Sequence, residues 1–125
     1  MVPKFRCFDK DTKTMHEVVA IDFEDWRVYY EAYGLRNYWN KNVVLMQSTG
    51  LHDENGVEIF QGDIVEIIYD GKPFIGVVVY DLGETDFKAT NNREDYGNNF
   101  QYLTVGESIE VIGDIHKNPE LLEDV

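Results

Sequence analysis

The residues of this sequence that could do chemistry are mainly its carboxylates. The densest group lies in the C-terminal half and comprises Asp81, Glu84, Asp86, Glu94 and Asp95. Clustered carboxylates can bind Mg²⁺ or Ca²⁺, or act as a general acid and base. Such a cluster is more often the solvated face of a loop. We therefore expect an acidic surface that faces a protein partner, with metal-dependent hydrolysis by Asp81, Glu84 and Asp86 as the weaker alternative.

The histidines and the cysteine form no catalytic or metal-binding pattern. His16, His52 and His116 lack the short spacing of zinc ligands, and the chain has neither a Gly-x-Ser-x-Gly motif nor a glycine-rich phosphate loop. Cys7 lies in an expected strand without the flanking residues of a cysteine enzyme. We expect a packed thiol there, and we expect no enzymatic activity, no cofactor and no metal site.

The net charge of −13 is confined to one part of the chain. Residues 1–50 hold seven basic and seven acidic residues, whereas residues 51–125 hold four basic and 17 acidic residues. This balance argues against wrapping of a nucleic-acid backbone, which requires Lys and Arg to neutralise phosphates. An acidic surface favours a basic protein as partner, either directly or by imitating the phosphates of DNA.

Six large aromatic residues fall within 14 positions of the neutral part. Side chains of this kind are common in protein interfaces, although they also fill hydrophobic cores. A small β-layer cannot bury six rings fully, so we expect several of them to mediate self-association. The set is Trp26, Tyr29, Tyr30, Tyr33, Tyr38 and Trp39.

The hydrophobic pattern indicates a mainly β protein. Residues 5–8 and 15–23 form an expected hairpin, and residues 43–47 form a later strand. Residues 26–33 fit both a strand and a helical face, and their Tyr and Trp content favours a strand. Residues 34–42 are polar and aromatic and are expected to form a loop.

The C-terminal part predicts a small barrel. Residues 57–117 contain about five short strands separated by turn residues, and an SH3-like barrel closes so few strands without long edges. Gly76 suggests a bulge or bend, and Asn118-Pro119-Glu120 indicates the start of a short C-terminal helix. We expect two parts packed together: an N-terminal antiparallel β-hairpin layer over residues 1–50 and an acidic barrel over residues 51–125.

Three stretches resemble the YopX family: residues 4–10 (KFRCFDK), residues 45–65 (LMQSTGLHDENGVEIFQGDIV) and residues 110–122 (EVIGDIHKNPELL). The resemblance spans essentially the whole chain, although residues 24–42 match nothing in it. It implies a predominantly β, homo-oligomeric protein encoded by a bacteriophage or prophage. It supplies no biochemical activity and no catalytic residues.

Location and partners follow from these observations together. The N-terminal residues hold no apolar run long enough for a signal peptide, and no apolar run comes near the roughly 20 residues that span a bilayer. The single cysteine fits a reducing compartment. We expect a cytoplasmic protein of the bacterial host that contacts itself and a basic host or phage protein, and no membrane. The alternative is a small nucleic-acid-binding regulator that uses the SH3-like barrel and a local basic patch, with Lys4, Arg6, Lys10, Lys13, Arg27 and Arg36 as its candidates.

Overall fold

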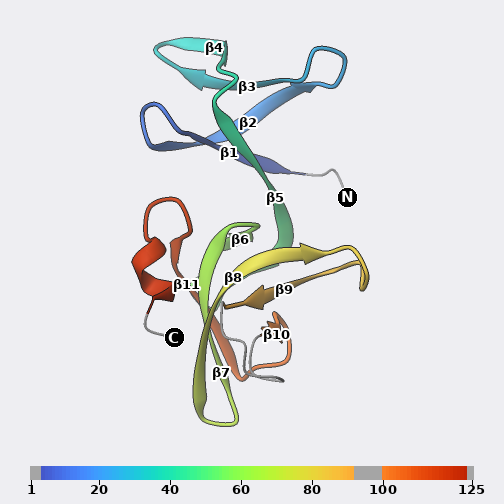
Figure 1. Ribbon diagram of the computed structural model, residues 1–125, viewed down its shortest axis with the longest axis vertical. Coiled ribbons are helices and arrows are strands. Elements are labelled where there is room, and N and C mark those ends of the chain that lie inside the picture. Colours follow the sequence, from blue (N-terminus) through green and yellow to red (C-terminus); the bar gives the residue numbers. More distant parts are fainter. Residues whose placement is uncertain (1–3, 92–99, 124–125) are drawn as a thin grey trace. The chain divides into compact units, whose positions relative to one another are not determined.

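The computed structural model describes residues 4–91 and 100–123 and divides the chain into two compact units (Figure 1). The N-terminal unit comprises residues 1–48 and the C-terminal unit comprises residues 49–125. Strand β5 (Val43–His52) crosses this division without a break. Residues 49–52 are therefore strand, although their sequence suggested the beginning of a turn.

The N-terminal unit is an antiparallel meander. Its other strands are β1 (Phe5–Asp9), β2 (Thr14–Asp22), β3 (Arg27–Ala32) and β4 (Leu35–Trp39). Strand β1 lies between β2 and β5, with Cys7 opposite His16 on one side and opposite Leu45 on the other. The full sheet has the order β4-β3-β2-β1-β5-β6, which leaves β4 at one edge.

Residues 26–33 are mostly strand, as their Tyr and Trp content suggested, but the expected loop at residues 34–42 is wrong. Tyr38 and Trp39 lie in β4, opposite Tyr30 and Tyr29. The reversal between β3 and β4 is made by Tyr33 and Gly34, which both have positive φ angles, 53° and 75°. Two consecutive positive φ angles give a tight hairpin. Because Tyr-Gly is an unusual pair for such a turn, the sequence did not reveal it.

The C-terminal unit is built around a second antiparallel sheet with the order β10-β9-β8-β7-β11. The strands of this sheet are β7 (Asp63–Tyr69), β8 (Lys72–Asp81), β9 (Asp86–Thr90), β10 (Phe100–Tyr102) and β11 (Ser108–Asp114). The short strand β6 (Glu58–Phe60) also belongs to this part of the chain but pairs with β5 in the first sheet. The core of the C-terminal unit consists of small and branched apolar side chains, namely Ile59, Val65, Ile67, Val78, Ala89 and Leu103. Val65 and Ile67, which the alternation in residues 64–69 places on one face of β7, both belong to this core.

The mainly β fold is confirmed, and both sheets are antiparallel. Within the described strands the five-stranded sheet is open, with β10 and β11 at its two edges, so closure into a barrel is not confirmed.

The expected bulge at Gly76 is absent, because β7 and β8 pair in continuous register across it. Glycine is needed there for space: a Cβ would lie 2.9 Å from the backbone N and O of Thr90. The irregularity in β11 falls instead between Val111 and Gly113.

The chain ends in a short 3₁₀ helix, η1 (Pro119–Leu122), where a short helix was expected. Leu122 is buried and η1 contacts β8. Asn118 does not cap the helix through its side chain; its Oδ1 accepts a hydrogen bond of 3.2 Å from the Asp114 N–H instead. In the part of the chain that is described, no helix has the length and apolar character needed to cross a membrane.

Candidate interaction surfaces

The six aromatic residues singled out above differ widely in exposure. Trp26 and Tyr33 are 79% and 70% exposed, and Trp39 is 40% exposed. Tyr29 and Tyr38 are half-buried, and Tyr30 is completely buried. Tyr30 therefore belongs to the core of the N-terminal unit and has no surface to offer a partner.

The rings also divide between the two faces of the sheet. Tyr30 and Tyr38 lie opposite each other and pack edge to face with centroids 5.4 Å apart, and Tyr33 packs on Tyr38 at 5.1 Å. Tyr29 and Trp39 are the next pair, so they occupy the other face. The six rings therefore surround the β3–β4 edge of the sheet without forming one flat patch.

The two most exposed rings sit at strained backbone positions. Trp26 and Tyr33 have φ angles of 57° and 53°, in the left-handed region that bulky residues rarely adopt. Trp26 ends the turn between β2 and β3, and Tyr33 begins the turn between β3 and β4. Neither backbone strain nor exposure of a large ring stabilises the isolated unit.

Edge strand β4 is irregular, which limits how it can be extended. Its register with β3 shifts between Tyr30 and Ala32, where Ala32 lies opposite Leu35. A bulge at an edge and an exposed charge such as Arg36 both disfavour continuous pairing with another strand. Another chain would therefore contact this edge through side chains, and not by pairing a further strand with β4.

Asp9 organises the interior of the N-terminal unit. Its carboxylate accepts hydrogen bonds from the N–H groups of Asp11 and Thr12, at 2.9 and 3.2 Å, and from the Tyr30 hydroxyl. Burial by itself would raise the pKa of Asp9, but these donors outweigh it and hold the pKa below its usual value. Burial, with the Asp9 charge, raises the pKa of Cys7 to about 12, so this thiol is packed and protonated.

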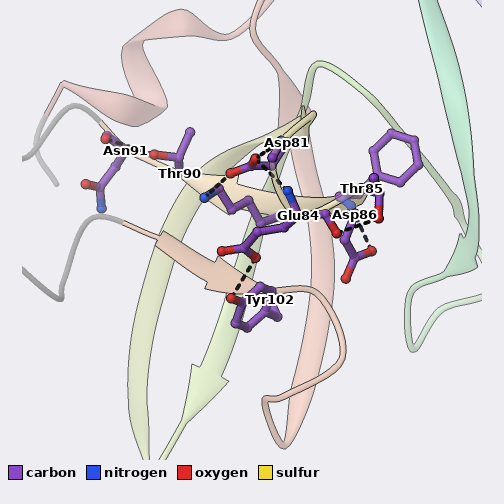
Figure 2. A network of polar contacts seen from close by, with 10 residues as sticks. Asp81, Glu84, Thr85, Asp86, Thr90, Asn91 and Tyr102 are labelled. Carbon is purple, nitrogen blue, oxygen red and sulfur yellow. Dashed lines mark hydrogen bonds and ion pairs between the residues drawn. The ribbon is translucent and has the colours of Figure 1, made fainter.

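The acidic residues between β8 and β9 are tied into a local network (Figure 2). Lys88 Nζ lies 2.6 Å from Asp81 Oδ2, while Asp81 Oδ1 accepts hydrogen bonds from the N–H groups of Gly83 and Glu84. Lys88 also lies over the ring of Phe100, 4.3 Å from its centroid. The side-chain hydrogen bond from Lys88 is the main reason that the pKa of Asp81 is lowered.

The remaining acidic residues of this set are placed differently. Glu84 is exposed and accepts a hydrogen bond of 2.7 Å from the Tyr102 hydroxyl, as Figure 2 shows. Asp86 is exposed and accepts one from the Phe87 N–H. Glu94 and Asp95 lie outside the described residues. Glu84 and Asp86 are therefore exposed, whereas Asp81 is paired with Lys88.

Asp53, which the sequence suggested only as a turn residue, is a hub of the C-terminal unit. Its Oδ1 accepts hydrogen bonds from the N–H groups of Asn55 and Val57, and its Oδ2 accepts one of 2.9 Å from the N–H of Val111 in β11. Burial favours a raised pKa for Asp53, but the three N–H donors prevail and lower it. The carboxylate therefore fixes this turn to a strand almost 60 residues further along the chain.

Beside Asp53 lies an open pocket that the sequence did not indicate. Its volume is about 380 Å³, and its walls come from residues 51–54, Ile59, and residues 103–109 without Val105. These segments are far apart in the sequence and carry no shared motif, so no local signal could have located the pocket. Among the described residues, no group of three His, Cys, Asp or Glu side chains is arranged to hold a metal ion.

The family model that matches this chain and one of the similar solved structures point to the same family. The YopX protein family model matches residues 4–123. Protein EF1440 from Enterococcus faecalis is 28% identical, with a TM-score of 0.68 over 98% of this chain and 99% of that chain. YopX from Bacillus subtilis is 23% identical, with a TM-score of 0.65 over 95% of this chain and 97% of that one. The comparison with curated proteins gives no match. The chain belongs to the YopX family.

Proposed function

We propose that this protein is a non-enzymatic interaction module that self-associates through its N-terminal unit and binds a basic protein through its acidic C-terminal unit. In keeping with its family, it would serve a bacteriophage or prophage as an accessory protein in the host cytoplasm. The observation that carries the proposal is the combination, at Trp26 and Tyr33, of a large exposed ring with a positive φ angle.

Each of these two residues is unfavourable in an isolated chain. Asn or Gly would adopt the same backbone conformation at lower cost, and a polar side chain would be better solvated. The turn requires the positive φ angle but not a large exposed ring, and an unfavourable residue kept at a strained position supports a functional role. Contact with a second copy would bury the rings and supply the missing stabilisation.

Further exposed apolar side chains lie on the same elements. Phe23 is in the β2–β3 turn with Trp26, and Leu35 follows Tyr33 at the start of β4. Trp39, which shares a face of the sheet with Tyr29, carries the Arg27 guanidinium 4.5 Å from its ring centroid. Because residues 1–50 have no net charge, two copies can meet here without the repulsion that the acidic part would cause.

The test is the oligomeric state of a variant that keeps the fold. Trp26→Asn and Tyr33→Asn together remove both rings and place a residue that tolerates positive φ at each turn. We expect sedimentation to show an oligomer for the wild type at micromolar concentration and a monomer for this variant, with unchanged or increased free energy of unfolding at high dilution.

The matched control removes exposed apolar side chains from the other unit. Leu82→Ser and Tyr69→Ser both change exposed residues of the C-terminal unit, and we expect the oligomer to persist. A wild-type protein that stays monomeric at high micromolar concentration contradicts the self-association. An oligomer that the Asn variants leave intact contradicts the contact at Trp26 and Tyr33.

A further inference from the structure

The pocket beside Asp53 combines an apolar base with an acidic rim. Ile59 is completely buried and Leu103 nearly so, and Ile109 adds a third apolar wall. Glu54 and Glu107 are exposed lining residues. A volume of about 380 Å³ falls in the range of small-ligand pockets, which start at roughly 300 Å³.

The two rim glutamates are held in place by their backbone. The Glu54 N–H donates a hydrogen bond of 3.2 Å to the Ile109 carbonyl, and the Glu107 N–H donates one of 2.7 Å to the Ile68 carbonyl. Their side chains therefore extend from anchored positions. This reduces the conformational entropy that a partner would have to remove on binding.

The acidic side chains outnumber the basic ones in the pocket. Asp53, Glu54 and Glu107 line it together with His52, and the described lining residues include no Lys or Arg. The Asp53 carboxylate is ionised and buried, so it adds to the negative potential of the wall without being available as a ligand. The surrounding residues 51–125 have a net charge of −13.

We propose that this pocket receives the side chain of an arginine or lysine from a basic segment of the partner protein. Such a side chain has an apolar stem, which fits against the accessible surfaces of Leu51 and Ile109, and a cationic end, which would lie between Glu54 and Glu107. This proposal rests on the basic partner of the proposed function and identifies the site that binds one of its side chains. It does not depend on self-association.

The experiment is an NMR titration of the full chain with a short capped peptide that carries two arginines among glycines. We expect saturable shifts of the Glu54, Gly106 and Ser108 backbone amides. The same peptide with citrulline in place of arginine keeps the shape but removes the charge, and it should leave these amides unshifted.

Three variants locate the effect. Glu54→Gln with Glu107→Gln should weaken binding about 5- to 20-fold, since each exposed ion pair contributes up to roughly 1 kcal/mol. Glu120→Gln with Glu123→Gln removes the same charge from the exposed C-terminal segment and should leave binding within about twofold. Thr104→Trp, at an exposed lining residue, should block the pocket without changing its charge.

The outcomes separate the two proposals. Shifts that spread to amides outside the pocket contradict binding in the pocket, and so do shifts that both Gln pairs reduce equally. Either result remains compatible with a basic partner that binds elsewhere on the C-terminal unit. Absence of shifts, or tighter binding of spermidine than of the peptide at the same amides, also overturns the proposed pocket site. A monomeric protein that still shows the pocket shifts contradicts the self-association alone.

Discussion

The Tyr30 hydroxyl donates a hydrogen bond of 3.0 Å to Oδ2 of the buried Asp9 carboxylate. The two residues lie on β3 and β1, with β2 between them, so the tyrosine reaches across a whole strand. On the way its ring stacks against His16 of β2, with centroids 4.6 Å apart. This contact joins three strands on one face and accounts for the complete burial of Tyr30, whereas Tyr29 is half-buried and Glu31 is exposed.

Removing the Tyr30 hydroxyl should destabilise the protein. Tyr30→Phe leaves the ring packing intact but takes away one donor to a buried charge, which we expect to lower the free energy of unfolding by about 1.5–3 kcal/mol. Urea denaturation of both proteins at pH 7 measures this difference in the free energy of unfolding. Tyr69→Phe, at an exposed residue, is the control and should have little effect. A loss below about 0.5 kcal/mol for Tyr30→Phe would mean that the hydrogen bond is not a determinant of stability.

The Asp53 hub should make stability depend on pH in the acidic range. The pKa of Asp53 in the folded protein lies below its usual value of 3.8. Its contribution is therefore complete above the unfolded pKa and is lost as the pH falls through the folded pKa. We expect Asp53→Asn to cost roughly 1–3 kcal/mol at pH 7, because an amide cannot accept all three N–H bonds.

The difference between wild type and Asp53→Asn should begin to shrink near the unfolded pKa of about 4 and should keep shrinking until the pH lies below the lowered folded pKa, where the wild-type carboxyl is also neutral. Comparing the two proteins at each pH cancels the general effect of titrating the other acids. Asp70→Asn, in the exposed β7–β8 turn, is the control. A wild-type advantage that stays constant down to pH 2 would contradict the role of the ionised Asp53.

Cys7 should be unreactive in the folded protein. Its pKa is raised from 9.0 to about 12 by burial and by the Asp9 charge, which lowers the thiolate fraction at pH 8 about a thousandfold. We expect modification by a thiol reagent at pH 8 to be slower by at least that factor in buffer than in concentrated urea. Rapid modification without denaturant would show that the thiol is accessible and ionised.

Lys88 should control the ionisation of Asp81. Lys88→Met removes the ion pair and leaves the carboxylate with only its backbone donors, so the pKa of Asp81 should rise toward its usual value. An NMR titration of the side-chain carboxyl measures this shift. Lys72→Met, at the exposed start of β8, removes the same charge and should leave the Asp81 titration nearly unchanged. Equal shifts in both variants would indicate a general charge effect.

The local patterns of the sequence predicted the strands better than their connections. Alternating apolar residues identified β7 and β8, and Asp70-Gly71 marked the tight turn between them, where both residues have positive φ angles. Strand β4 was missed because its turn, Tyr33-Gly34, has an unusual first residue and its own residues are mostly exposed. Gly76 suggested a bulge or bend; the bulge is absent, and glycine is required because the Thr90 backbone of the neighbouring strand lies too close for a Cβ, which the local sequence could not reveal.

The chain sequence by itself determined the mainly β class, the family and the separation of a neutral part from an acidic part. These properties follow from residue type, order and charge. Each can be obtained from short stretches of the chain or by adding up its residues, without knowing which strands become neighbours. Only the tertiary structure decided that Tyr30 belongs to the core and Trp26 to the surface, and that Asp81 is paired with Lys88. It alone brought Glu54 and Glu107 to the rim of one pocket. The physical reason is that exposure, ion pairing and pocket shape depend on which strands become neighbours, and strand pairing joins residues that are distant in the chain.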